Sequence, residues 1–274
     1  MNVLTAPTNL GNRPYEDNGR ARQTTDGPSR LRGQRIVQRL GARDLGDVAA
    51  APYRDLVRAA PTRNEDLVLD HVNRIAEVIA EQKDFTLVLG GDCSTLLGCL
   101  LGLRQKGSEP ALVFIDGHTD FNTPATSETG GVAGMDLALA TGRGDTPLAR
   151  LDPRGPLVRD EHVVTVGVRD GGFGDANIRA ATNAREVLEV VGDREFFIHI
   201  DADVLDEAHM PFVDSPQPNG LAPEELTALL AELAAHPRAV GMELTIYDPR
   251  HDHDARGAKL LAGILEESLR SRRG

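Results

Sequence analysis

Three apolar segments of the sequence are each followed at once by side chains that could bind a metal ion or transfer a proton. The first is followed by GGDCS at residues 90–94, the second by DGHTD at 116–120, and the third by DADVLD at 201–206. Carboxylates, imidazoles and thiols are the groups with which proteins hold transition metals and perform acid–base catalysis. These three motifs are therefore the first candidates for a functional centre.

Two of the motifs place their polar side chains at alternate positions. Alternate side chains of an extended segment point the same way, which puts Asp116, His118 and Asp120 on one side, and Asp201 with Asp203 likewise. Four carboxylates gathered in a low-dielectric cleft would repel one another strongly. Divalent cations remove that repulsion, and a mixed carboxylate and imidazole set suits Mn²⁺ or a similar ion. Two such ions, bridged by carboxylates, would hold an acidified water as hydroxide.

Each motif alone also has an ordinary structural explanation. Asp and His at strand ends often form turns, and GGDCS is typical of a tight turn with Ser94 as helix N-cap. A lone Cys93 is more often a small buried side chain than a ligand. We interpret His199 as a core histidine and 251–254 as a solvated turn. The joint occurrence of the three motifs, each after its own apolar segment, favours a functional centre.

Hydrophobic patterning predicts the elements that position these motifs. Buried strands are predicted at Asn2–Thr5, Phe85–Leu89, Ala111–Ile115, Val163–Val168, Phe196–Ile200 and Val240–Ile246. Helices are predicted at Asn64–Lys83, Ser94–Gln105, Pro223–Ala235 and Gly257–Arg270. Strands that alternate with helices predict an α/β fold with a mostly parallel sheet covered on both faces. Ligands bind outside the carboxyl ends of such strands, so the three motifs should face one crevice.

Two polar, glycine-rich segments, 8–30 and 122–135, predict long loops. No linker, repeat or low-complexity tract divides the chain, so a single domain over residues 1–274 is expected.

Composition limits the class of protein. The chain carries 30 basic and 42 acidic residues, a formal net charge of −12, which argues against a nucleic-acid partner. No apolar run approaches the roughly 18 residues that span a bilayer, and no secretory signal is visible. Cys93 and Cys99 are the two cysteines, which excludes a disulfide scaffold. We expect a cytoplasmic enzyme or small-ligand binder with no membrane partner.

In this order the motifs resemble those of the ureohydrolase family, which includes arginases, agmatinases and formiminoglutamases. Residues 116–124, DGHTDFNTP, are close to the D-A-H-T-D-x-N-T-P of arginases. Residues 87–92 match a family strand that normally ends G-G-D-H-S, and residues 200–206 match D-x-D-x-x-D-P. The resemblance implies an arginase-like, three-layer α/β/α domain with a mostly parallel sheet of about eight strands.

By this resemblance, two groups of four residues would each hold one divalent ion. The first group is Cys93, Asp116, Asp120 and Asp201, and the second is Asp116, His118, Asp201 and Asp203. Asp120 would orient the attacking hydroxide and pass its proton to the leaving amine, and His118 is the second catalytic candidate. Mn²⁺ is the expected metal, with Zn²⁺, Fe²⁺, Co²⁺ and Ni²⁺ left open because of Cys93.

The resemblance also implies a small guanidino-type substrate and a homo-oligomer. Asn122 is a candidate substrate contact because arginases use the matching asparagine. Glu243 and Asp248 are further candidates, either as a replacement grip on the substrate or as structural hydrogen-bonding groups.

Three departures from the family pattern bear on the substrate. Cys93 replaces the usual histidine ligand, as in the relative that cleaves N-omega-hydroxy-L-arginine. Ala133 stands at the place of a proton-shuttle histidine, and Ile246 at the place of a glutamate that grips guanidinium. Loss of that carboxylate would remove about 2–4 kcal/mol of binding. A less basic group, such as an N-hydroxyguanidine, acylguanidine, formimino group or amide, would need no such grip.

Two alternatives stay open beside a guanidine hydrolase. One is amide hydrolysis on the same fold. The other is an inactive homologue that binds a ligand or partners an active subunit, which Cys93, Ala133 and Ile246 favour and the retained carboxylates oppose.

Overall fold

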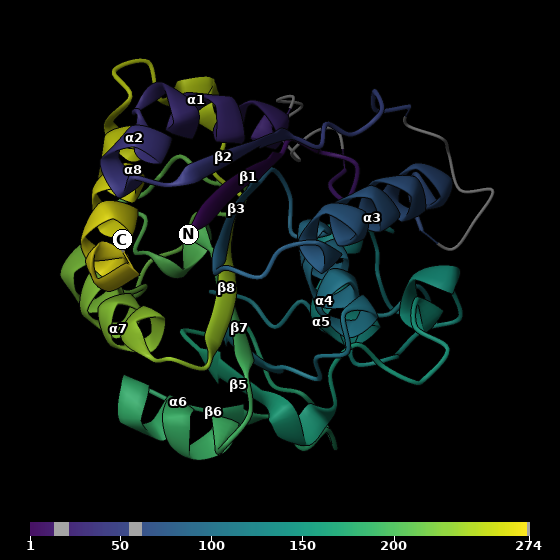
Figure 1. The fold of residues 1–274 in the computed structure, drawn as a ribbon. Helices are drawn as coiled ribbons and strands as arrows, with labels where there is room; N and C mark the ends of the chain where they lie inside the picture. The colour runs from purple at the N-terminus through teal and green to yellow at the C-terminus, as the bar shows by residue number, and fades with distance from the viewer. Residues whose placement is uncertain (14–21, 55–61, 273–274) are drawn as a thin grey trace.

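The computed structural model describes residues 1–13, 22–54 and 62–272 (Figure 1). Within these ranges eight strands form one sheet in the order β2-β1-β3-β8-β7-β4-β5-β6, and every pairing is parallel. The strands are β1 Asn2–Ala6, β2 Arg43–Asp47, β3 Thr86–Gly90, β4 Ala111–Ile115, β5 Val163–Val166, β6 Arg179–Ala180, β7 Phe196–Asp201 and β8 Ala239–Thr245.

The six strands expected from apolar runs are confirmed, with ends that differ by at most two residues. They are almost wholly buried, because a parallel sheet covered on both faces needs apolar side chains on both sides. The edge strands β2 and β6 were not expected. Both are largely exposed and polar, so no apolar run marks them.

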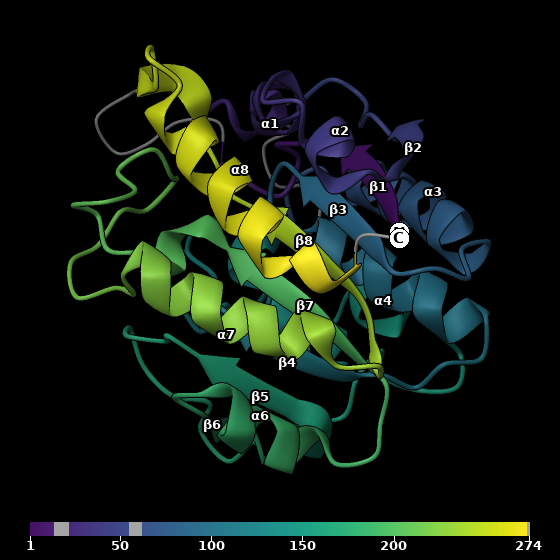
Figure 2. The ribbon, with the colours of Figure 1, turned by 60° about the vertical axis from the view of Figure 1, so that its left-hand side comes forward.

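Helices cover both faces of the sheet (Figures 1 and 2). One face carries α1 Gly27–Gly33, α2 Ile36–Leu40, α6 Ala184–Val191, α7 Pro223–Ala235 and α8 Arg256–Ser268. The other face carries α3 Glu65–Ala80, α4 Thr95–Gln105 and α5 Asp136–Ala140. Two buried apolar clusters, one on each side of the sheet, join the layers. The expected three-layer α/β/α architecture is therefore confirmed, and no helix in the described ranges is long and apolar enough to cross a bilayer.

Two local expectations are wrong in part. The expected loop 8–30 already turns helical at Thr24–Asp26 and enters α1 at Gly27, with Pro28 in the first turn; residues 14–21 lie outside the described ranges. The expected solvated turn at 251–254 holds for His251, His253 and Asp254, which are exposed, but Asp252 is 1% exposed. Its carboxylate accepts hydrogen bonds from the Tyr247 hydroxyl at 2.6 Å and from the Ala258 amide at 3.0 Å, so Asp252 fixes the start of α8.

The strand order explains how the three motifs come together. β3, β8, β7 and β4 are consecutive in the middle of the sheet, and the motifs follow β3, β4 and β7. The carboxyl ends of parallel strands lie at one edge, and a ligand crevice forms where the chain changes direction across the sheet. The fold thus gathers three motifs that are up to 111 residues apart in sequence (90 to 201).

Candidate metal centre

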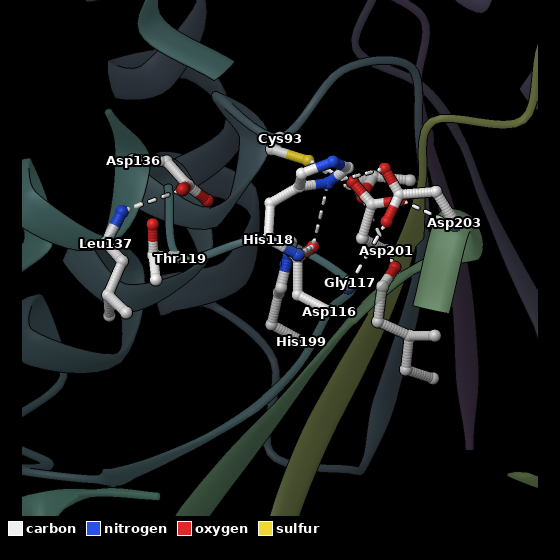
Figure 3. Close-up of polar contacts among 12 residues, drawn as sticks. Cys93, Asp116, Gly117, His118, Thr119, Asp136, Leu137, His199, Asp201 and Asp203 are labelled. Carbon is white, nitrogen blue, oxygen red and sulfur yellow. Dashed lines mark hydrogen bonds and ion pairs between the residues drawn. The ribbon is translucent and has the colours of Figure 1, made fainter. Parts of the chain in front are cut away.

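All six predicted metal ligands lie together at the carboxyl edge of the sheet. Figure 3 labels Cys93, Asp116, His118, Asp201 and Asp203 among them. They form two groups, and within each group the potential ligand atoms lie within 4.8 Å of one another. The first group is Cys93, Asp120 and Asp201, and the second is Asp116, His118 and Asp203. The sequence motifs therefore meet in space as expected.

A tight turn after β3 positions Cys93. The Asp92 carboxylate accepts hydrogen bonds from the Ser94 and Gly11 amides, both at 2.9 Å. Gly91 packs against Thr8, where an added Cβ would lie 1.9 Å from the Thr8 carbonyl oxygen. Ser94 occupies the N-cap position of α4, as expected, but its hydroxyl makes no capping hydrogen bond; the Asp92 carboxylate orders the turn instead.

The cysteine thiol faces β7 and β8. Cys93 Sγ donates to Asp201 Oδ2 at 3.2 Å and lies 3.2 Å from Thr245 Oγ1. Asp201 Oδ1 in turn accepts from the Asp203 amide at 2.7 Å. Burial, then the negative charge of Asp201, raises the pKa of the Cys93 thiol, so the thiol keeps its proton until a cation compensates the charge.

The second group is organised around the end of β4. Asp116 Oδ1 accepts from the His118 amide at 2.7 Å, and His118 Nδ1 lies 3.0 Å from Asp203 Oδ2. Gln217 Nε2 lies 2.9 Å from His118 Nε2. Burial lowers the pKa of His118, but Asp116 and Asp203 outweigh burial and raise it to about 11.

Asp120 reaches the cluster from an unusual backbone conformation. Its φ is 41°, in the left-handed region that Asp and Asn adopt more readily than most residues. Burial, then the charge of Asp116, raises the pKa of Asp120. The pKa values of Asp201 and Asp203 are also raised, mainly because both carboxyls are buried and also because other carboxylates lie nearby. The cluster therefore strongly favours bound positive charge.

These residues fit a pair of divalent cations. Asp116 Oδ2 is buried with no hydrogen-bond partner among the described residues, and such an atom costs about 1–3 kcal/mol unless compensated. Carboxylates, one imidazole and one thiol are the donors that first-row divalent ions accept. The donor set thus agrees with the two-ion expectation.

A cavity of about 190 Å³ opens onto the cluster. Its walls include His118, Asp120, Asp201 and Asp203 together with Ala133 and Ile246. Arg22 and Asp214 form an ion pair at its rim. The volume suits a small molecule, and two of the three departures from the family motifs lie on its wall.

The three proposed substrate contacts, Asn122, Glu243 and Asp248, are not among the described residues that line this cavity. Asn122 is exposed, and its side-chain oxygen accepts from the Thr126 hydroxyl at 3.4 Å. Asp248 is buried and forms an ion pair with Arg250 at 2.8 Å. Glu243 is fully buried and lies 2.8 Å from His199 Nδ1. Their contact with substrate stays a prediction.

Sequence reasoning missed Asp136 and Gln217. Asp136 is fully buried at the start of α5, within reach of Cys93 and His199. A single acidic residue inside the apolar run MDLALA at 135–140 was the available signal. Gln217 lies in an irregular segment, where no periodicity marks a functional residue. His199 is a core histidine, as expected, and stacks on Phe114 at 4.6 Å.

Comparisons with known proteins agree with one another. A model of the Arginase family matches residues 13–270. N(omega)-hydroxy-L-arginine amidinohydrolase of Streptomyces lavendulae is 31% identical over 232 residues, which cover 81% of each chain. Arginase of Bacillus subtilis (strain 168) is 26% identical over 280 residues, covering 92% of this chain and 94% of the relative. A crystal structure of Bacillus subtilis arginase matches with a TM-score of 0.85 at 25% identity, covering 98% and 97% of the two chains.

Proposed function

Because the chain belongs to the arginase family, we propose that it hydrolyses a guanidino or related linear C–N bond at a centre of two divalent ions. The observation that carries this proposal is the meeting of all six candidate ligands at one edge of the sheet, where His118, Asp120, Asp201 and Asp203 line a small cavity. The family match supports hydrolysis of such C–N bonds in general, and the residues on the cavity wall bear on the substrate.

Two overlapping sets of side chains would hold the ions. We assign Cys93, Asp116, Asp120 and Asp201 to one ion, and Asp116, His118, Asp201 and Asp203 to the other. Mn²⁺ suits the carboxylate-rich set, while the Cys93 thiol shifts the preference of its own ion towards softer metals. When bound, the ions would lower the pKa of water and so supply a nucleophile at neutral pH.

Asp120 is the side chain placed to move the proton. It lines the cavity, and its carboxyl has a raised pKa because it is buried next to Asp116. As water adds to the guanidino carbon, Asp120 would accept a water proton and return it to the amine as the C–N bond breaks. His118, held by Asp203 and Gln217, would keep the second ion's ligands in place.

The cavity wall favours a substrate of low basicity. Ile246 and Ala133 line it, so no carboxylate stands at the position that grips guanidinium in the family. We therefore propose an N-hydroxyguanidine or a similarly weak base as the reacting group. The amidinohydrolase of Streptomyces lavendulae, which is named for N(omega)-hydroxy-L-arginine, supports this choice.

Metal content and product release together test the proposal. Elemental analysis after Mn²⁺ loading should give two ions per chain, and a panel of guanidino compounds should release urea or hydroxyurea. One ion per chain, with hydrolysis of amides only, would replace the guanidine proposal by an amide hydrolase. No ion under any loading would contradict the proposal and support an inactive, ligand-binding homologue.

A further inference from the structure

A third group of potential ligands lies deeper than the two groups that face the cavity. Cys93 Sγ, a carboxylate oxygen of Asp136 and a ring nitrogen of His199 all lie within 4.8 Å of one another. All three residues are buried, with no exposed surface. They come from the turn after β3, the first residue of α5 and the interior of β7. In Figure 3 Asp136 approaches from the side opposite Asp203, with Cys93 between them.

Two of these three residues each carry a buried side-chain atom with no hydrogen-bond partner among the described residues. Asp136 Oδ1 accepts from the Leu137 amide at 2.7 Å, but Asp136 Oδ2 has no hydrogen-bond partner among the described residues. The same holds for His199 Nε2. Its nearest charged neighbour is Asp116 Oδ2 at 3.9 Å, which is too far for a hydrogen bond. Buried polar atoms left in this way are costly, and both belong to the same three-residue group.

The imidazole of His199 is already oriented as a metal ligand. Its Nδ1 lies 2.8 Å from Glu243 Oε1, and Thr95 Oγ1 donates to Glu243 Oε2 at 2.8 Å. Metal-ligating histidines almost always donate their second ring N–H to a carboxylate or carbonyl in this manner. With the proton on Nδ1, Nε2 is the ring nitrogen left to bind a cation.

We propose that Cys93, Asp136 and His199 form a closed site for one transition-metal ion, with Zn²⁺ the best match. Sulfur, nitrogen and oxygen ligands together are typical of Zn²⁺ and unlike the oxygen-rich surroundings that Mn²⁺ prefers. On binding, the Cys93 thiol releases its proton to solvent and its sulfur becomes a thiolate ligand, and the Asp136 carboxyl and His199 Nε2 release any proton that they carry. The ion would tie β3, β7 and α5 together whether or not the chain hydrolyses a guanidine.

Cys93 also belongs to the open group with Asp120 and Asp201. That group lines the cavity through both aspartates, so an incoming ion could meet Cys93 there before it reaches the closed site. Both sites use this sulfur. When the closed site is filled, its ion takes Cys93 and the open ion keeps Asp116, Asp120 and Asp201; when the closed site is empty, Cys93 binds the open ion as assigned above.

Cobalt titration of the metal-free full-length protein separates the two assignments. Co²⁺ takes Zn²⁺ sites, and a thiolate ligand gives a near-ultraviolet charge-transfer band. We expect this band in the unaltered protein and its loss in Cys93→Ser. Asp136→Asn should weaken the affinity for the thiolate-bound Co²⁺ about 10-fold or more. The matched control, Asp120→Asn, makes the same isosteric change in the open group and should leave that affinity unchanged.

Three results would overturn the proposal. The first is a charge-transfer band that survives Asp136→Asn but is lost in Asp120→Asn. The second is an equal loss of Co²⁺ affinity in both variants. The third is the absence of the band in the unaltered protein. Circular dichroism of the metal-free variants verifies folding. If Asp136→Asn does not fold, His199→Gln replaces it with the same expected loss and the same contrary outcome. These readouts are independent of urea release, so failure of the closed site and failure of the proposed hydrolysis are distinguishable.

Discussion

His199 and Glu243 face each other in register on the adjacent parallel strands β7 and β8, with His199 Nδ1 2.8 Å from Glu243 Oε1. Neither residue has exposed surface. Burial lowers the pKa of His199, but the neighbouring carboxylates of Asp116 and Glu243 outweigh burial and raise it. The Glu243 carboxylate therefore holds both the charge and the orientation of a ring whose other nitrogen lies 3.9 Å from Asp116, a candidate metal ligand.

Glu243→Gln should weaken metal binding without unfolding the protein. Gln has the shape of Glu and still accepts from His199, but it lacks the charge that makes the ring a strong donor. Loss of such a carboxylate typically costs about 10- to 100-fold in metal affinity. Zn²⁺ competition against a fluorescent chelator measures the change. Cys99→Ser is the control, because Cys99 Sγ also contacts Glu243 Oε2, at 3.6 Å, and the change keeps the charge of Glu243. An equal loss of Zn²⁺ affinity in Cys99→Ser would contradict the proposed role of the charge.

Much of the centre could be predicted because its ligands directly follow strands. Cys93, Asp116 and Asp201 come at or just after apolar runs that a buried parallel strand requires, and a parallel sheet brings such strand ends to one edge. Local sequence therefore specified both the element and the place of these ligands. The position of Ile246 on the cavity wall agrees with the place that the family resemblance gave it.

The rest could not be read from local pattern. Glu243 and His199 lie inside strands that are buried on both faces. Such strands show no alternation of polar and apolar residues, so the sequence does not indicate which face of the strand a functional site would occupy. The exposed edge strand Arg43–Asp47 has no apolar run, and five-residue helices such as α5 are too short for helical periodicity. The helix α6 did carry a usable signal, since the Asn183 side chain caps it by accepting from the Glu186 amide at 3.1 Å.

Asp152→Asn should lower stability in a pH-dependent way. Hydrogen bonds from Arg154, together with Arg104 Nε at 2.8 Å, hold the pKa of the Asp152 carboxyl well below its usual range. Asp152 therefore stabilises the fold above its unfolded-state pKa of about 4, and that stabilisation is lost as the pH falls through the depressed folded-state pKa. The variant should lose about 2–3 kcal/mol at pH 7 and progressively less below pH 4.

Denaturant unfolding at pH 7 and pH 3 measures this difference. Asp145→Asn is the matched control, because Asp145 pairs with Arg150 on an exposed surface, where ion pairs contribute little. A loss for Asp152→Asn that is the same at both pH values would contradict the linkage argument.

Ile246→Glu should improve turnover of strongly basic guanidines. Ile246 lines the cavity at a φ of 66°, a strained conformation for a β-branched residue, so Glu is accommodated at least as well. A carboxylate there would restore a charge-assisted grip worth about 30- to 1000-fold in kcat/KM. Initial rates of urea release from an alkylguanidine measure the gain. Ile246→Gln offers a similar shape without charge, and an equal gain in that variant would show that charge is not the cause.

Asp120→Asn should remove most of the turnover and leave the protein folded. Asn adopts the left-handed backbone of residue 120, φ 41°, as readily as Asp does, so the local fold is kept. Asn cannot accept the proton that the proposed step passes to the leaving amine, and loss of such a group typically costs about 100- to 10,000-fold in rate. The rate is measured at saturating Mn²⁺, so that weaker ion binding does not cause the loss. Asp170→Asn, which changes an exposed carboxylate bonded to the Thr119 amide at 2.9 Å, should keep normal turnover. Near-normal turnover in Asp120→Asn with both ions bound would exclude Asp120 as the proton carrier and leave metal ligation as its contribution.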